Sequence, residues 1–315
     1  MAPGVTSPAI DLSRTGIWLL LGAAVLLAAA GLPEFREAGN LANVVRQSSA
    51  LGLLAIGQTF VILAGLIDLS VGMAAGLVVV LACALMGGDA AATLPVALAM
   101  LALGAGIGAV NGTLANTLRV HPLILTFGML FVLQGAIFTY TDRSVGRASE
   151  PLQTLANGDI AGIPISGLVL VAAAVAAHLV ITRTRFGHHL VAVGGHAESA
   201  RRSGIPVARI RFLAFVISGF FAAAGGLVLA GRLGTGYPLA GSGLELDAIV
   251  AVVLGGTALS GGRGSVVRSV AGVLVLAVAS NVLNLLEVSA FVQTFVKGVI
   301  VIAAILANQP RRAGG

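Results

Sequence analysis

Long apolar runs, separated by short polar or glycine-rich breaks, make up almost the whole chain. A run of about 20 apolar residues is long enough to cross a bilayer as a helix. The pattern therefore predicts an all-α, polytopic membrane protein with about ten transmembrane helices. Their approximate ranges are 15–32, 46–66, 70–87, 93–115, 121–141, 164–182, 212–232, 247–262, 266–286 and 290–308.

Two of these spans have a second interpretation. The eighth begins with the charged residue Asp247 and is short and rich in glycine, so it is either a full span or a partly re-entrant element. The first follows a polar tail, and Ala28 to Gly31 resembles a signal-peptide cleavage site. We favour a retained first helix, because a multi-span protein needs no removable signal. The predicted organisation is a cytoplasmic tail (1–14), one transmembrane domain (15–308) and a second cytoplasmic tail (309–315).

The composition supports a membrane protein and excludes a water-soluble domain. Of the 315 residues, 57% are hydrophobic and 10% are charged, with a mean hydropathy of +1.03, whereas about a quarter of the residues in soluble domains are charged. The net charge of +6 does not indicate nucleic-acid binding, because the basic residues fall in short loops between spans. The single cysteine, Cys83, lies in an apolar run, so no intrachain disulfide is possible and packing is its expected role.

The distribution of arginine and lysine sets the expected orientation, because basic residues concentrate in cytoplasmic loops. An N-terminus inside the cell places twelve of the eighteen basic residues on the cytoplasmic side, and inverting the chain reverses that ratio. These twelve are Arg14, Arg119, Arg183, Arg185, Arg201, Arg202, Arg209, Arg211, Arg263, Arg268, Arg311 and Arg312. An even number of spans with both termini inside is therefore favoured.

The apolar stretch from Gly57 to Gly76 is interrupted once by an acid and a hydroxyl, Asp68 and Ser70. A carboxylate at a bilayer centre costs on the order of a few kcal/mol, so Asp68 is expected at an aqueous edge or in a protein-lined cavity. The simplest interpretation is a turn between two helices in which Asp68 or Ser70 caps the free N–H groups of the second helix. The alternative is a role in binding a solute or an ion.

Glycines at intervals of four residues predict smooth helix faces that let a neighbour approach closely. They are Gly104, Gly108 and Gly112 in one span and Gly72 and Gly76 in another. The spacing does not say whether that neighbour belongs to the same chain. A weak internal repeat also relates 62–72 to 252–262, and carriers often contain such repeats.

Residues for ATP hydrolysis, metal binding or nucleophilic catalysis form no recognisable constellation in the sequence. A P-loop needs a lysine beside Ser or Thr, and the only lysine, Lys297, is followed by Gly298 within an apolar run. The three histidines of the basic loop have no Cys or acids at ligand spacing. A proton-driven carrier would need several facing acids, for which the candidates are Asp68, Glu245, Asp247 and Glu287. We therefore predict no catalytic residue, no cofactor and no metal site.

Two loops are long enough to carry structure of their own. The external one, Asp142 to Ile163, predicts a short irregular excursion. The internal one, Arg183 to Arg211, contains a segment from Ala197 to Ser203 that lies between a Gly-Gly break and Gly204, which predicts a short helix. Its arginines fit docking against another protein or anchoring near anionic lipid, and the residues alone leave both open.

Three stretches carry a resemblance to a known family. They are Gly57 to Gly72 (GQTFVILAGLIDLSVG), Gly194 to Val207 (GGHAESARRSGIPV) and Glu245 to Gly264 (ELDAIVAVVLGGTALSGGRG). Together they resemble the membrane permease subunits of bacterial ribose-type ABC importers, which serve ribose, xylose, arabinose, galactosides and related small molecules. The similarity runs from about Asn40 to Asn308.

The resemblance implies a permease of the bacterial inner membrane, surrounded by membrane lipid, that works by alternating access. Its implied partners are a second permease subunit (an identical or related chain), cytoplasmic ATP-binding subunits and a periplasmic or lipoprotein substrate-binding protein. Gly195 to Gly204 resembles the coupling helix that fits a groove on the ATPase. The implied coupling residues are Gly194, Gly195, Glu198, Ala200, Arg201 and Gly204. The polar residues expected to line the translocation path are Gln58, Asp68, Ser70, Asn111, Glu245, Asp247, Thr257 and Ser260.

The sequence departs from the family pattern at two positions. His196 stands where Asn is usual, and Arg268 stands where a small residue is typical, which puts a close copy of the interface contacts and substrate choice in doubt. The expected function is import of a small polar solute, such as a monosaccharide, driven by separate ATPase subunits. A branched-chain amino acid permease and an ion-coupled carrier are the alternatives. The identity of the solute is expected to depend largely on the separate binding protein.

Overall fold

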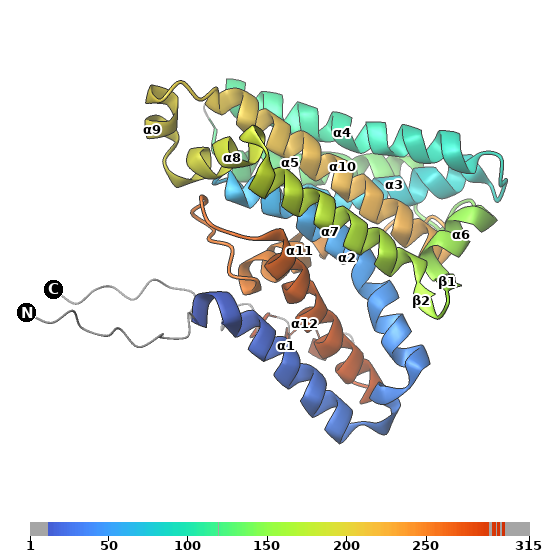
Figure 1. The fold of residues 1–315 in the computed structure, drawn as a ribbon. Helices are drawn as coiled ribbons and strands as arrows, with labels where there is room; N and C mark the ends of the chain where they lie inside the picture. The colour runs from blue at the N-terminus through green and yellow to red at the C-terminus, as the bar shows by residue number, and fades with distance from the viewer. Residues whose placement is uncertain (1–11, 119, 290–291, 294, 297, 300–315) are drawn as a thin grey trace, which may run out of the picture.

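The chain is almost entirely helical (Figure 1), as seen in a computed structural model that describes residues 12–118, 120–289, 292–293, 295–296 and 298–299. The helices are α1 (Leu12–Gly31), α2 (Ala38–Leu63), α3 (Val71–Met86), α4 (Thr93–Thr117), α5 (Pro122–Tyr140), α6 (Glu150–Asn157), α7 (Ile165–Arg183), α8 (Arg185–Gly195), α9 (Ala197–Arg202), α10 (Val207–Leu233), α11 (Leu244–Leu254) and α12 (Val266–Leu285). A short 3-10 helix, η1 (Pro33–Arg36), and a two-stranded antiparallel sheet, β1 (Asp159–Ile160) and β2 (Ile163–Pro164), complete the described elements. The predicted all-α class is confirmed.

Helices α2 and α10 form the centre of the bundle. They pack against each other. Helix α10 also contacts α3, α4 and α6, and helix α2 also contacts α7, α11 and α12. Phe60 of α2 and Phe215 of α10 are among the largest fully buried side chains. The outer helices α5 and α7 instead expose apolar side chains such as Phe131 and Val171, and extended apolar surfaces of this kind are typical of contact with a membrane.

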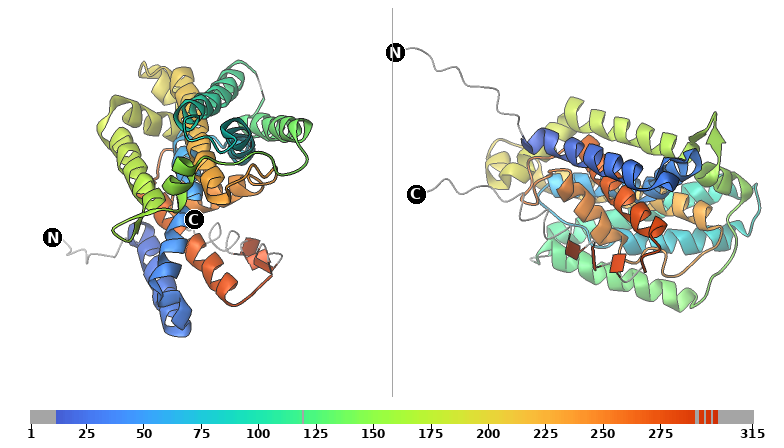
Figure 2. Two further views of the ribbon diagram at one scale, coloured as in Figure 1. Left: turned by 90° about the vertical axis from the view of Figure 1, so that its right-hand side faces the viewer. Right: turned by 90° about the horizontal axis from the view of Figure 1, so that it is seen from below.

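The two ends of the bundle differ in structure. Helices α8 and α9 lie at one end, and α6 with the β1–β2 hairpin lies at the opposite end (Figures 1 and 2). We call these the α8–α9 end and the hairpin end. Helix α1 runs alongside α12, and buried apolar residues of the two helices pack together, including Ala28 of α1 and Val278 of α12.

The described helices follow most of the predicted spans. Five of them, α4, α5, α7, α10 and α12, are both long and apolar enough to cross a membrane. Helices α1 and α3 also match their predicted ranges closely, whereas α2 begins at Ala38 rather than 46 and α10 begins at Val207 rather than 212. The tenth predicted span, 290–308, falls largely outside the described residues, as do most of the 1–14 tail and all of the 309–315 tail. The count of ten therefore stays a prediction.

The eighth predicted span is wrong as a continuous helix over 247–262. Helix α11 has 11 residues and ends at Leu254, which gives a length of about 16 Å, or half the thickness of a hydrocarbon core. It follows a non-helical segment, 235–243, and the left-handed residue Gly256 (φ 78°) comes directly after its cap. The partly re-entrant alternative matches this arrangement.

Both long loops contain more structure than the sequence predicted. The loop from Asp142 to Ile163 is not simply irregular, because it holds α6 and the first strand of the hairpin. The loop from Arg183 to Arg211 contains the predicted short helix as α9, but it also contains α8, which was not predicted. Leu190 and Val193 of α8 are buried, so packing against the bundle stabilises a helix that three glycines and two histidines make unfavourable locally.

The glycine face of α4 packs against α10 of the same chain. A Cβ atom added to Gly112 would lie 2.9 Å from the Phe212 Cα atom, and one added to Gly108 would lie 2.9 Å from the Val216 Cα atom. Real Cβ atoms do not come this close to other atoms. The two backbones can therefore pack at this separation only because the glycines have no side chain. The question of which chain supplies the neighbour is thus answered for this face.

Candidate functional site

A buried polar cluster surrounds Asp68, in the break between α2 and α3. Its Oδ1 atom accepts hydrogen bonds from the Ser70 N–H (3.0 Å) and the Ser70 hydroxyl (2.6 Å), and its Oδ2 atom accepts one from the Ser218 hydroxyl of α10 (3.2 Å). Asn111 of α4 donates to the Ser70 oxygen (2.8 Å). All four residues are at most 1% exposed. The carboxyl group therefore has donors on both oxygens, which offsets much of the cost of burying it.

Two further side chains fix the backbone of the same break. The Gln58 amide of α2 is oriented so that its nitrogen donates to the Asp68 carbonyl oxygen (3.2 Å) and its oxygen accepts from the Asp68 N–H (3.3 Å). The Thr126 hydroxyl oxygen of α5 accepts from the Leu69 N–H (3.1 Å). Non-helical backbone within a bilayer needs such partners, so side chains from four helices together hold the break in place.

This geometry bears on both interpretations of the Asp68 region. Ser70 is the N-cap residue of α3, but its side chain makes no capping hydrogen bond. Asp68 accepts the N–H of Ser70 itself, so it stabilises the turn just before the helix rather than the free N–H groups inside it. The predicted path residues Gln58, Asp68, Ser70 and Asn111 do come together, yet they are bonded mainly to one another and to the backbone.

The remaining predicted path residues lie on the discontinuous span formed by residues 234–262. Glu245 is buried at the start of α11 and Asp247 is half-buried two residues later. Thr257 is 1% exposed, whereas Ser260 is exposed. The structure therefore divides the predicted set into the Asp68 cluster and a second group along this span.

Helices α2 and α11 end with the same backbone motif. The N–H groups of Gly65 and Leu66 donate to the carbonyls of Ile62 and Val61, as Gly256 and Thr257 donate to Val253 and Val252. Gly65 and Gly256 both adopt left-handed conformations (φ 76° and 78°), as this type of helix end requires. The two matching glycines, Gly65 and Gly256, are one residue out of register with the predicted internal repeat, which pairs Gly65 with Gly255, so the repeat stays a prediction.

The loops that follow these two helix ends meet the C-terminus of α8. The Gly262 N–H donates to the Leu63 carbonyl oxygen (3.0 Å). A Cβ atom on Gly194 would lie 2.6 Å from the Gly262 nitrogen, and one on Gly261 would lie 2.7 Å from both the Gly194 oxygen and the Gly65 Cα atom. We call Leu63, Gly65, Gly194, Gly261 and Gly262 the glycine junction. Its backbones touch directly, so a displacement of α8 acts on both loops.

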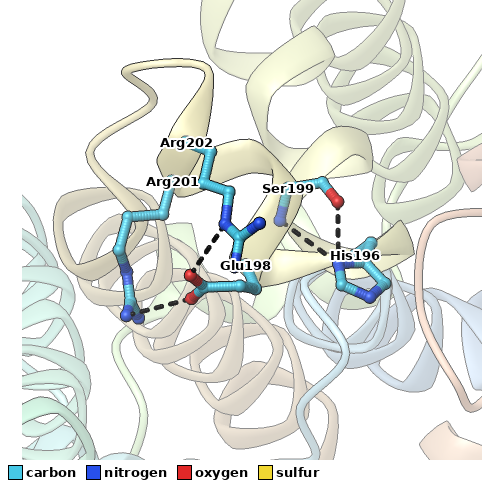
Figure 3. A network of polar contacts seen from close by, with 5 residues as sticks. All are labelled: His196, Glu198, Ser199, Arg201 and Arg202. Carbon is cyan, nitrogen blue, oxygen red and sulfur yellow. Dashed lines mark hydrogen bonds and ion pairs between the residues drawn. The ribbon is translucent and has the colours of Figure 1, made fainter.

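Beyond the junction, α9 presents a charged surface at the α8–α9 end (Figure 3). Glu198 forms ion pairs with Arg201 (3.3 Å) and Arg202 (3.3 Å). The three side chains are between 49% and 80% exposed, so these pairs contribute little to stability and leave the charged groups accessible. Gly204 follows with φ 80°, and the N–H groups of Gly204 and Ile205 close the C-terminus of α9 on Arg201 and Ala200.

His196 is the N-cap residue of α9. Its Nδ1 atom accepts the Ser199 N–H (3.2 Å) and lies 3.0 Å from the Ser199 hydroxyl oxygen (Figure 3). Asparagine, the usual residue of the family pattern, is among the most favourable N-caps, so the substitution preserves the local function. Ala200 is 5% exposed within the main core cluster and faces inward, unlike the exposed Glu198 and Arg201.

The sequence was compared with known protein families and proteins. A family model described as "Branched-chain amino acid transport system / permease component" matches residues 40–305. The ribose import permease protein RbsC of Escherichia coli (strain K12) is 37% identical over 291 residues, which cover 89% of this chain and 88% of that protein. The chain belongs to the ribose/arabinose-type ABC permease family.

Two further relatives agree with this assignment. RbsC of Bacillus subtilis (strain 168) is 37% identical over 309 residues (96% of this chain, 94% of that protein), and the L-arabinose transport system permease protein AraH of Escherichia coli (strain K12) is 33% identical over 318 residues (96% and 94%). No solved structure matches the chain. The permease is therefore a multi-pass protein of the inner membrane, and its relatives are transport subunits rather than enzymes.

Sequence reasoning missed several residues of these sites. Ser218 and Thr126 complete the Asp68 cluster, and Leu63, Gly261 and Gly262 complete the glycine junction. A hydroxyl inside an otherwise apolar span, as at Ser218, is a usable signal because membrane interiors rarely leave it without a partner. The junction residues gave no such signal, because glycines are frequent throughout this chain.

Proposed function

We propose that the permease is the membrane-spanning subunit of an ABC importer for a small polyhydroxyl solute, most closely a monosaccharide such as ribose. The observation that carries this proposal is the 37% identity to ribose import permeases across nearly the whole of both chains. The arabinose relative supports a sugar of similar size. A branched-chain amino acid remains the competing solute, because the family model carries that description.

The permease has no ATPase site of its own in this proposal, and separate ATP-binding subunits supply the energy. A second permease subunit, identical or related, completes the membrane unit, and a periplasmic or lipoprotein binding protein delivers the solute. We further propose that the α8–α9 end faces the cytoplasm, as the distribution of arginines favours. ATP-driven movement then shifts the membrane spans between two conformations that differ in which side they open to.

Coupling to the ATPase is proposed to run through α9 and the glycine junction. The exposed Glu198, Arg201 and Arg202 form a surface suited to a charged groove on the ATPase. Gly194 and Gly195, at the end of α8, contact the loops after α2 and α11, which are the two places where the spans are discontinuous. A push on α9 is therefore transmitted to both broken spans at once.

The coupling proposal is tested by Glu198→Trp and by Gly194→Ala, because the first obstructs the exposed face and the second separates the junction. We expect both variants to assemble with the ATPase or to retain ATP hydrolysis while solute uptake falls by about tenfold or more. Gly106→Ala in α4 is the matched control, since a Cβ at that position has nothing within 4 Å and lies outside the proposed coupling surface. Normal uptake by Glu198→Trp in a normally assembled complex would contradict the role of α9.

The proposed function is tested by uptake of labelled ribose, arabinose and leucine in cells that carry the permease and its partner subunits. We expect ribose or arabinose uptake that requires the permease and stops when ATP is depleted. Leucine uptake would favour the amino acid alternative. Uptake that survives ATP depletion but collapses with the ion gradient would identify an ion-coupled carrier and overturn the proposal.

A further inference from the structure

The start of α11 lies deep within the bundle, after a long stretch of non-helical backbone. Residues 235–243 run alongside α3: Gly236 packs against Val80, and Gly241 packs against Gly76 nearer the start of that helix. One turn into α11, Ala248 packs with Leu54 of α2. Leu54 lies nine residues before the end of α2, or about 14 Å along its axis, which places this region near mid-bundle.

This stretch also has an exposed face. Tyr237 and Leu239 are 45% and 44% exposed, and Leu246, in the first turn of α11, is 58% exposed. Non-helical backbone is not tolerated against lipid tails, but it is tolerated where protein covers it or where it lines a water-filled cavity. The face therefore belongs to the interior of the transporter rather than to its lipid-facing surface.

Glu245, the second residue of α11, has an unpartnered carboxyl oxygen. The residue is 8% exposed, and its Oε2 atom makes no hydrogen bond to any described residue. No ion pair of Glu245 occurs in the described part of the chain. Oε2 points toward Gly72 of α3, where any side chain would collide with it. The pair of small residues, Gly72 and Gly241, provides the room for the carboxyl group.

A buried oxygen of this kind carries a large desolvation cost until a donor reaches it. It differs in this respect from Asp68, whose two oxygens already accept hydrogen bonds from Ser70 and Ser218. The Glu245 carboxyl group accepts hydrogen bonds from the backbone N–H groups of Gly243 and Glu245 at the start of α11, so Oε2 is the oxygen that still lacks a donor. A hydroxyl group supplies the single donor that Oε2 lacks.

We propose that Glu245 is a solute-recognition residue, whose Oε2 atom accepts a hydrogen bond from a hydroxyl of the transported solute at the start of α11. This inference rests on the proposed import of a polyhydroxyl solute and adds the residue that contacts it inside the membrane. Only one such bond is required, since the permease must release the solute as well as bind it.

The test uses the complete transporter with its binding protein, and D-ribose and its singly deoxygenated analogues as probes. Glu245→Met removes the acceptor at similar size, and Glu245→Gln keeps one acceptor oxygen. Glu34→Met makes the same change at an exposed residue of η1 and serves as the control. All variants use the same binding protein. Its preference among the sugars therefore affects every variant equally and cancels when the uptake ratio of each analogue to ribose is compared between variants.

We expect Glu245→Met to lower ribose uptake by about tenfold or more, the effect of losing one hydrogen bond to a charged group. Uptake of the analogue that lacks the recognised hydroxyl should fall much less, so the ratio of ribose uptake to uptake of this analogue should be smaller in Glu245→Met than in the unmodified transporter. Glu245→Gln should be intermediate and Glu34→Met unchanged. Assembly should stay normal in all variants.

Three outcomes would overturn the inference. Normal ribose uptake by Glu245→Met would remove any role in recognition. An equal loss for ribose and every analogue, or failed assembly, would indicate a structural or subunit-contact role instead. If the unmodified transporter imports none of these sugars, the proposed function itself fails, and this inference fails with it; a failure confined to the variants concerns Glu245 alone.

Discussion

The contact between α4 and α10 predicts that Gly108→Ala destabilises the permease although alanine favours helix formation. A Cβ atom at Gly108 would lie 2.8 Å from the Phe215 carbonyl carbon and 2.9 Å from the Val216 Cα atom. Ordinary contacts begin near 3.4 Å, and the added Cβ would also overlap the Phe215 carbonyl oxygen, so the two helices must separate by about 1 Å or more. Overpacking of this kind costs about 1–3 kcal/mol, because backbone atoms cannot rotate out of the way.

The matched control is Gly106→Ala in the same helix, where an added Cβ meets nothing within 4 Å. Both substitutions gain about 1 kcal/mol of helix propensity, so the difference between them isolates the packing cost. The assay is the midpoint temperature for loss of the monodisperse peak in fluorescence-detected size-exclusion chromatography after heating. We expect Gly108→Ala to fall several degrees below Gly106→Ala. Equal midpoints would refute the inferred helix contact.

Three further substitutions test other parts of the structure by the same heating assay or by uptake. Asp68→Leu removes three accepted hydrogen bonds and should cost about 2–4 kcal/mol, whereas Asp68→Asn should cost about 1; equal midpoints would contradict this. His196→Asn should retain uptake, and His196→Ala should lower it by loosening α9, a capping loss of about 1 kcal/mol. Asp159→Asn should weaken the 2.6 Å pair with Arg46 by up to about 1 kcal/mol, and added salt should reduce that difference.

Periodicity and length predicted the long helices because those elements depend on local composition. α4, α5, α7 and α12 each begin and end within about three residues of the predicted ranges. The same reasoning failed for residues 247–262, where hydropathy is high but the backbone is only half helical. An apolar run cannot distinguish a continuous helix from a broken one when the break is stabilised by contacts with residues distant in sequence.

The candidate sites show the same division. Asp68 was recognisable as an anomaly because a lone acid in an apolar stretch needs a partner. Its partner Ser218 lies 150 residues away along the chain, and Thr126, which bonds the neighbouring Leu69, lies 57 residues from that residue on another helix. The glycine junction was still less visible. Its backbone contacts join three segments that are distant in sequence, and nothing in a sequence with 43 glycines distinguishes the few that meet.

The two buried acids of the broken spans have different surroundings: Asp68 has donors on both oxygens, whereas Glu245 has one oxygen without a donor. This difference predicts that one break is held firmly and that the other moves more easily. Asp68 is satisfied on both oxygens by donors from Ser70 and from Ser218 of α10, so moving it alone would cost several hydrogen bonds. Glu245 has a free oxygen and sits on a half-helix whose far end, through Gly261 and Gly262, contacts α8. The Asp68 break is therefore expected to move as part of a rigid body, whereas α11 is expected to shift relative to it when α9 is displaced.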